Sequence, residues 1–423
     1  MAKERRDSKN RLLGRGEYQK EDGRYMYRYI DANGKARFVY SWTLTKTDRT
    51  PAGKTPGPCL RDMIVQITKD VNDEIDTYNA KKSTVNDYFE KYLSQKKKLR
   101  QRTRQCYRSK YNLYAKGRIG NKKIYNVKFS DICKCYAEII EECKISSQTL
   151  YVVDVVLKAL FQIAIRDGLI RANPVEGAFE SVSGKDSTRN IRKETLTSQQ
   201  TDIFLDFIRE NNVYKKWENL YIVMLGTGCR VGEICGLIWD DCDFENNTIR
   251  IERSLSYYPE EYTGKYSWTI HEPKTECGKR EIPMLPHVRS ALLEQKKHYL
   301  KNGFCVSTVD GVSGFVFCNS RQGVLIPNEV NKTLTRIVRT YNKYERKKAE
   351  LDGRDSVLLP DFTPHTLRHT FCTRLCEAGV DIKVVQEIMG HSTISVTMDI
   401  YNNLTEDYKV RSMKKVDNIF KTG

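Results

Sequence analysis

The sequence predicts a multi-domain protein that is mainly α-helical with small β-sheets. Its 423 residues suit two or three domains, each with its own core. Alternating hydrophobic residues near the N-terminus indicate a β-hairpin, the middle of the chain has helical periodicity, and the last half alternates helices with short strands. We therefore expect a hairpin module at residues 1–80, a helical domain at 84–182 and a mixed α/β domain at 192–423.

The N-terminal module is predicted from two alternating segments around a turn. Residues 24–30 alternate with period two, a turn sequence containing Asn33 and Gly34 follows, and residues 35–44 alternate again. One face of this hairpin carries Arg24 and Arg28, and tyrosines line the other face. A two-stranded ribbon with arginines fits the major groove of DNA. An ordinary basic surface on a sheet explains the pattern equally well.

The helical domain carries a long basic segment. Between Lys96 and Lys123 there are twelve basic residues and no acidic one, and tyrosines are interleaved at helical spacing. Such a segment is either a solvated helix face or a contact surface for the DNA backbone, and the lack of acidic partners favours the backbone. The residues that we expect to contact DNA here are Lys96, Lys97, Lys98, Arg100, Arg102, Arg104, Arg108 and Lys110.

Charge and composition narrow the class of partner. The net charge of +18 divides into +6 for residues 1–82, +10 for 83–190 and only +2 for 191–423. Excess Lys and Arg neutralise phosphates, so we expect a nucleic-acid partner. No run approaches the roughly 18 apolar residues of a membrane span and no secretory signal is evident, so we expect a cytoplasmic protein without a membrane partner. Thirteen scattered cysteines indicate reduced thiols rather than a metal site.

Four side chains suited to phosphoryl transfer lie within 37 residues near the C-terminus: His365, Arg368, His391 and Tyr401. A guanidinium clamps a phosphate through two parallel hydrogen bonds. Histidine moves protons at neutral pH, and a positioned tyrosine can be a covalent nucleophile. No acidic cluster of the kind that holds catalytic magnesium lies nearby. The pattern predicts cutting and rejoining of a phosphodiester without a metal or cofactor.

Four short motifs follow one another along the second half of the chain. They are Gly226–Glu233, Pro273–Thr275 with Arg280–Pro283, His365–His369, and Met389–His391 followed by Tyr401. With these motifs in this order, the chain from Thr84 to Tyr401 resembles a tyrosine recombinase of the phage-integrase family, and their combination is far more specific than any one of them. The interval from His391 to Tyr401 is ten residues, one longer than the family's commonest spacing, and no other tyrosine lies near enough to replace Tyr401.

This resemblance implies a role for each motif residue. Tyr401 would attack the scissile phosphorus to give a 3′-phosphotyrosine and a free 5′-hydroxyl. Arg230 and Arg368 would hold the two non-bridging oxygens. His365 would act as general base on the phenol, and His391 would donate to a non-bridging oxygen.

Two further residues would support this chemistry. Lys274 would protonate the departing 5′-oxygen, with Lys279 as its rival at the same hairpin tip. Glu233, one helical turn beyond Arg230, would orient an arginine.

The resemblance also implies the domain roles and the partners. The N-terminal module resembles the arm-site-binding domain of integrases from conjugative transposons, so residues 84–182 would bind the core site and 192–423 would be catalytic. Integration and excision of a mobile element by a homo-tetramer on double-stranded DNA would follow, with an excisionase and a host DNA-bending protein as possible helpers. A type IB topoisomerase-like relaxing enzyme and an inactive DNA-binding regulator are the alternatives. An apolar stripe at residues 408–420 suggests that the C-terminal tail docks on a neighbouring subunit.

Overall fold

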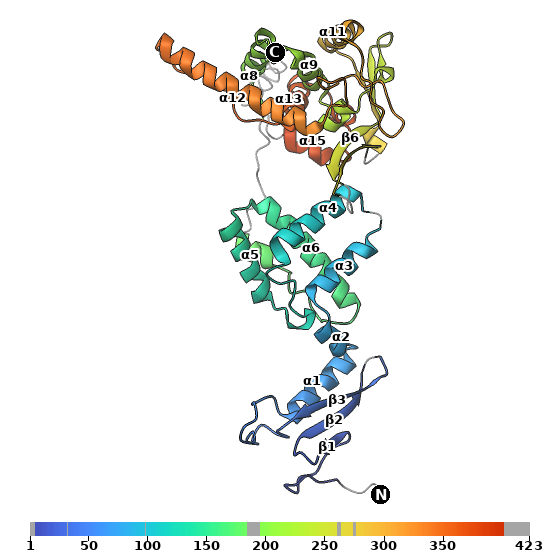
Figure 1. The fold of residues 1–423 in the computed structure, drawn as a ribbon, viewed down its shortest axis with the longest axis vertical. Coiled ribbons are helices and arrows are strands. Elements are labelled where there is room, and N and C mark those ends of the chain that lie inside the picture. Colours follow the sequence, from blue (N-terminus) through green and yellow to red (C-terminus); the bar gives the residue numbers. More distant parts are fainter. Residues whose placement is uncertain are drawn as a thin grey trace, which may run out of the picture. The chain divides into compact units, whose positions relative to one another are not determined.

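A computed structural model describes residues 5–31, 33–97, 99–183, 195–259, 264–273 and 276–401, with side chains to residue 398 in the last range. The chain separates into two compact units, 1–190 and 191–423 (Figure 1). The expected class, mainly helical with small antiparallel sheets, is confirmed. Lys98, Lys274 and the C-terminal segment 402–423 lie outside the described residues.

The N-terminal part of the first unit is a three-stranded antiparallel sheet with a helix on one face. The sheet order is β1-β2-β3, and the predicted hairpin corresponds to β2 and β3. Sequence reasoning missed β1, a strand of three residues. The bounds are β1 Glu17–Gln19, β2 Tyr25–Ile30, β3 Ala36–Ser41 and α1 Leu60–Asn72.

A small apolar core holds α1 to the sheet. Leu13, Tyr25, Leu44 and Leu60 are buried together. The hairpin turn is fixed by Asp31, whose carboxylate accepts hydrogen bonds from two backbone N–H groups in the turn at 2.8 and 3.0 Å. The sheet's exposed face carries aromatic side chains as well as arginines.

The second part of the first unit is a helical bundle built around α6. Its elements are α2 Thr77–Lys82, α3 Val85–Gln95, α4 Gln101–Lys110, a π-helical turn at Tyr111–Ala115, α5 Phe129–Cys143, α6 Ser147–Arg166 and α7 Ala178–Ser183. Thr84 caps α3: its hydroxyl accepts from the Asp87 N–H at 3.2 Å, and the Asp87 carboxylate accepts from the Thr84 N–H at 2.8 Å.

One expectation about apolar runs is wrong. Within the described residues, α6 is long and apolar enough to cross a membrane by length and composition alone. Its buried side chains, however, form the centre of the helical bundle, packing with α3, α4 and α5. The length and apolarity of α6 therefore reflect its place as a core helix.

The second unit packs helices around two small sheets. Its helices are α8 Ser198–Glu210, α9 Glu218–Thr227, α10 Val231–Cys235, α11 Pro286–Asn302, α12 Pro327–Asp352, α13 Pro364–Glu377, α14 Ile382–Met389 and α15 Ile394–Tyr401. One sheet has the order β4-β5-β8 (Cys242–Asp243, Thr248–Ile251, Arg280–Pro283), and β6 Ser254–Pro259 pairs with β7 Tyr266–His271 as a hairpin. One large apolar core joins most of these elements, and a smaller, separate core lies between α13 and α14. α9 packs against both α11 and α13 (Figure 1).

Candidate active site

Arg230 is positioned by a sharp break between α9 and α10. Gly228 ends α9 with a left-handed backbone (φ 62°), and a Cβ at this position would lie 2.5 Å from the ring of Phe371. Glycine is therefore required both by the conformation and by the close packing. The chain then turns so that Arg230 stands at the start of α10, with its side chain 41% exposed.

Glu233 lies one turn further along α10, and its side chain is almost fully buried. Its carboxylate accepts from Arg230 Nη1 at 2.7 Å and from the Arg230 N–H at 2.9 Å. Arg280 Nη2 donates to the same carboxylate at 2.8 Å. Burial by itself would raise the pKa of Glu233, but the charges of Arg280 and Arg230 lower this pKa to about 2. Glu233 is therefore ionised at neutral pH and orients Arg230.

Arg368 lies in α13 and is 1% exposed. Its Nη1 donates to the carbonyl of Gly228 at 2.8 Å, and its Nη2 donates to the carbonyl of Met389. Burial, followed by the nearby charge of Arg230, lowers the pKa of Arg368 to about 10, which leaves it protonated at neutral pH. Two bonds use only two of the five N–H groups of a guanidinium, so Arg368 can still donate to a ligand.

His365 begins the same helix one turn before Arg368 and is exposed. Residues three apart share a helix face, so His365 and Arg368 project from the same side of α13. The ring of His365 meets that of His369 edge to face, with 4.6 Å between centroids.

His391 follows the end of α14, where Gly390 adopts a left-handed backbone (φ 62°). The side chain is buried, and its Nδ1 lies 2.9 Å from the hydroxyl of Thr397 in α15. α15 packs against both α13 and α14 and ends at Tyr401. The side chain of Tyr401 lies outside the described residues, so its predicted role stays a prediction.

The C-terminal end of α14 gathers three arginines from separate parts of the chain. Consecutive carbonyls accept from different guanidinium groups: Ile388 from Arg280 Nε at 2.7 Å, Met389 from Arg368, and Gly390 from Arg230 Nη2 at 3.4 Å. The carbonyls at a helix C-terminus carry partial negative charge and lack partners within the helix. This helix end therefore fixes the three arginines relative to His391.

The segment expected to carry a catalytic lysine is described only in part. Lys274 is not among the described residues, whereas its rival Lys279 is 43% exposed and pairs with Glu272 at 3.3 Å. A Cβ on Gly390 would lie 2.9 Å from the carbonyl oxygen of Cys277, so the turn before β8 contacts the end of α14. The choice between the two lysines stays open.

Among the described residues, no group of three or more His, Cys, Asp or Glu side chains is arranged to hold a metal ion.

The predicted DNA-contacting residues of the N-terminal module lie on the sheet. Arg28 is exposed on β2, opposite Phe38 of β3. Arg24 is less available, because it pairs with Asp22 at 2.7 Å and stacks over the ring of Tyr40. The face that carries these arginines is thus partly aromatic, which the alternation alone did not reveal.

The basic segment of the helical domain needs a correction. We expected its cations to lack acidic partners, but Arg108 pairs with Glu90 at 2.8 Å and Lys122 pairs with Asp131 at 2.6 Å. Glu90 lies on α3 and Asp131 lies on α5, outside the basic segment. A count of charges within the segment therefore does not detect them. The Arg104 side chain also donates to the carbonyl of Leu93 in α3.

The remaining candidate positions lie at or near the start of α4 and at its end. Lys96, Lys97, Arg100 and Arg102 are exposed, and the ammonium group of Lys110 lies over the ring of Tyr114. Their contact with DNA stays a prediction.

Sequence reasoning missed a basic stripe on α12. The stripe consists of five exposed cations spaced four, three, four and three residues apart, which places them along one side of the helix. They are Lys332, Arg336, Arg339, Lys343 and Arg346. Within the described part of the chain, no ion pair to an acidic side chain is seen for any of them. The spacing was present in the sequence, but the small net charge of this half of the chain concealed it.

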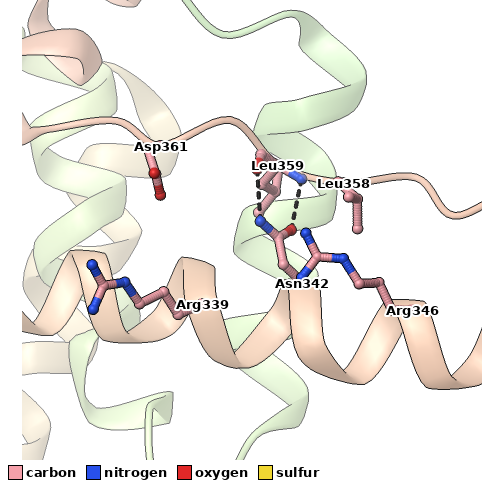
Figure 2. Close-up of a pocket in the computed structure, with 6 residues that line it drawn as sticks. All are labelled: Arg339, Asn342, Arg346, Leu358, Leu359 and Asp361. Carbon is pink, nitrogen blue, oxygen red and sulfur yellow. Dashed lines mark hydrogen bonds between the residues drawn. The ribbon is translucent and has the colours of Figure 1, made fainter.

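Part of this stripe borders a surface pocket (Figure 2). Arg339 and Arg346 lie on either side of Asn342, whose amide group bonds the backbone N–H and carbonyl of Leu359, both at 2.8 Å. Asp361 lies on the same facing segment. The guanidinium groups of Arg339 and Arg346 therefore project from a helix that Asn342 ties to the facing segment.

Comparisons with known proteins match both ends of the chain. Residues 194–407 match the phage integrase family, and residues 1–71 match the DNA-binding domain of Tn916 integrase. The transposase from transposon Tn916 of Enterococcus faecalis and that from Tn1545 of Streptococcus pneumoniae are each 36% identical to this chain. Each alignment covers 99% of this chain and 98% of the relative.

A solved structure is also similar. The Tn1549 transposon integrase in complex with transposon right end DNA is 32% identical, with a TM-score of 0.67, and the match covers 79% of this chain and all of that chain. The chain therefore belongs to the phage integrase family of tyrosine recombinases.

Proposed function

We propose that this protein is a site-specific DNA recombinase that integrates and excises a mobile element. One observation carries the proposal: Arg230, Arg368 and His391 meet at the C-terminal end of α14, and the helix that ends in Tyr401 packs against the same place. These are the groups that a transesterification at phosphorus needs. The similarity to transposases over nearly the whole chain supports a mobile element as the substrate.

Each residue has a definite part in the reaction. The phenolic oxygen of Tyr401 attacks phosphorus while His365 takes its proton, and the bond to the 5′-oxygen breaks. Arg230 and Arg368 stabilise the charge that builds on the non-bridging oxygens. A lysine from the stretch of sequence before β8, Lys274 by preference, protonates the leaving 5′-oxygen. The 3′-phosphotyrosine keeps the energy of the phosphodiester, so the hydroxyl of another strand can reseal it without ATP.

Three basic surfaces would hold double-stranded DNA. The sheet of the N-terminal module would bind arm sites, and the start of α4 would bind the core site. The α12 stripe adds a phosphate-contacting surface to the catalytic unit. Strand exchange between two duplexes requires four active sites, so a homo-tetramer is part of the proposal, as are an excisionase and a host DNA-bending protein. Such an enzyme would act on bacterial DNA in the cytoplasm.

A suicide substrate tests the proposal. A nicked duplex loses a short fragment on cleavage, so the covalent protein–DNA adduct accumulates and is read on a denaturing gel. We expect an adduct that persists in EDTA, disappears in Tyr401→Phe and remains in the control Tyr344→Phe, an exposed tyrosine on α12.

Other outcomes would redirect the assignment. An adduct that persists in Tyr401→Phe moves the nucleophile elsewhere, and cleavage that needs a metal indicates a nuclease. Relaxation of supercoiled DNA without site preference indicates a topoisomerase-like enzyme. Binding without any adduct indicates a regulator.

A further inference from the structure

Arg280 is a buried cation that the proposed chemistry does not use. It lies at the start of β8, and its side chain is 5% exposed. Its guanidinium group donates to the carboxylate of Glu233 at 2.8 Å, to the carbonyl of Ile388 at 2.7 Å and to the carbonyl of Gly278 at 3.1 Å. These acceptors belong to α10, to the end of α14 and to the turn that precedes β8. One side chain thus connects three segments that each border the candidate site.

Arg230 and Arg280 share the carboxylate of Glu233, so a change at Arg280 affects Arg230 through Glu233. One oxygen of Glu233 accepts from Arg230 Nη1, and the other accepts from Arg280 and from the Arg230 N–H. Without Arg280, Glu233 loses a bond that fixes its second oxygen and can rotate away from Arg230. The same loss frees the carbonyl of Ile388, three residues before His391.

A purely packing role explains these contacts less well. A buried strand residue is usually apolar, and a buried guanidinium group stabilises the fold only when its hydrogen bonds are satisfied. Three hydrogen bonds of Arg280 go to oxygens of separate elements around Arg230 and His391. The third segment, at Gly278, is the turn that carries Lys279 and follows Lys274 in the sequence.

We propose that Arg280 is a positioning residue for DNA cleavage, one that aims Arg230 through Glu233 and holds the end of α14 that presents His391. The proposal rests on the function assigned above. It makes Arg280 a group that touches no DNA, and its effect on the reaction passes through Glu233 and α14.

The test compares cleavage with binding in three variants. Arg280→Met removes the charge and every hydrogen bond, whereas Arg280→Lys keeps the charge with fewer donors. Arg250→Met is the matched control, because Arg250 is exposed on the adjacent strand β5 and pairs across the sheet with Glu281. For each protein, the affinity for core-site DNA, the single-turnover rate of adduct formation at saturating DNA and the thermal midpoint of unfolding are measured.

We expect Arg280→Met to bind DNA like wild type and to cleave about 10- to 100-fold more slowly, the range typical of residues that orient a functional group. Arg280→Lys should recover part of the rate, and Arg250→Met should lose none. Equal losses in binding and cleavage, or a wild-type rate in Arg280→Met, would overturn the proposal. If Arg280→Met does not fold, the test rests on folded Arg280→Lys. A wild-type cleavage rate in Arg280→Lys then overturns the proposal, and a slower rate with unchanged DNA affinity supports it.

A double-mutant cycle separates positioning from general damage. If Arg280 acts mainly through Glu233, Glu233→Gln and Arg280→Met combined should cleave little more slowly than Glu233→Gln alone. Fully additive losses would mean that Arg280 does not work through Glu233. Failure of the proposed function itself appears differently, since wild-type protein would then form no adduct at all.

Discussion

Two networks of charged side chains in this molecule are built around buried carboxylates, but they contain cations and anions in different proportions. In the N-terminal module, Arg11 bonds the carboxylates of Asp7 and Asp48, both at 2.8 Å, and Lys9 pairs with Asp48 at 3.1 Å. Two cations face two anions there, and the charges balance.

At the end of α14 the proportion differs. Arg230, Arg280 and Arg368 lie around Glu233, whose carboxylate forms ion pairs with Arg230 and Arg280. The positive charge exceeds the negative charge by two among these four residues. A balanced network stabilises a fold, whereas an unbalanced one is completed by an anionic ligand such as a phosphate. The comparison therefore supports the second network as the proposed site of DNA cleavage.

The largest expected effect comes from removing the forked donors of Arg368, the most buried arginine of the second network. Arg368→Lys replaces a fork of donors by one ammonium group, which cannot reach Gly228, Met389 and a phosphate together. We expect single-turnover cleavage to fall by about 10²- to 10³-fold, as when a donor to a developing oxyanion is lost. Arg374→Lys, on the same helix and paired with Glu377, should cleave normally. A near wild-type rate in Arg368→Lys would show that the reaction does not need a forked donor at this position.

The next effect concerns the orientation of His391. Thr397→Val removes the hydroxyl that meets His391 Nδ1 and keeps the shape of the side chain. Because Thr397 lies in the helix that ends at Tyr401, the change loosens both groups, and we expect cleavage to slow by about 10-fold. Thr397→Ser should restore the rate, and Thr393→Val, at an exposed position nearby, should not change it. Equal rates for Thr397→Val and wild type would contradict a role for this bond.

The features of the fold and site that could be predicted from the sequence are those that residues close together in the chain encode. The motif Gly226–Glu233 and the hairpin turn with Asn33 and Gly34 are each encoded within a few residues, and both could be identified from the sequence. Arg280 belongs to a motif that the sequence shows, but its role could not be predicted, because its acceptors at Glu233 and Ile388 are 47 and 108 residues away.

Contacts between residues far apart in the sequence also explain why the basic segment was misinterpreted and why β1 was missed. Glu90 and Asp131 neutralise cations of the basic segment from other helices, and only the fold brings them together. A three-residue strand such as β1 is too short for its period to be detected, since its pairing with β2 defines it. The motif residues could be named in advance, but the end of α14 as their common meeting point could not.

The cations of the α12 stripe are exposed, in contrast to the arginines gathered at the end of α14. Exposed cations that contact phosphates change the salt dependence of binding more than they change the chemistry. For the triple variant Arg336→Gln, Arg339→Gln and Lys343→Gln, we expect the slope of log affinity against log salt to fall by about one unit for each phosphate contact that is lost. Cleavage at saturating DNA should stay at the wild-type rate. Anisotropy titrations at several salt concentrations measure the slope.

Arg209→Gln is the control for this experiment, because Arg209 is exposed on α8 but paired with Asp206 and Glu218. An unchanged slope in the triple variant would remove α12 from the DNA-binding surface. A slowed rate at saturating DNA would instead place the stripe in the chemistry.

The smallest effect on cleavage is expected from the balanced network. Burial would raise the pKa of Asp48, but bonds from Arg11, from the N–H groups of Leu44 and Thr45, and from Lys9 lower it. An acid whose pKa is lower in the folded state stabilises the fold above its unfolded pKa of about 3.9, and this contribution is lost as the pH falls toward the folded value. Asp48→Asn should therefore lower the thermal midpoint more at pH 7 than at pH 3.

Asp22→Asn serves as the matched control within the same module. Asp22 is also paired with an arginine, but the pair is exposed and such pairs contribute little. It should lower the midpoint less than Asp48→Asn at pH 7. Both variants should form the covalent adduct at the wild-type rate on a substrate that has only the core site, because a charge-balanced network in the N-terminal module supplies no group to the reaction. A slowed adduct in Asp48→Asn at a temperature where the protein is folded would mean that the two networks are coupled.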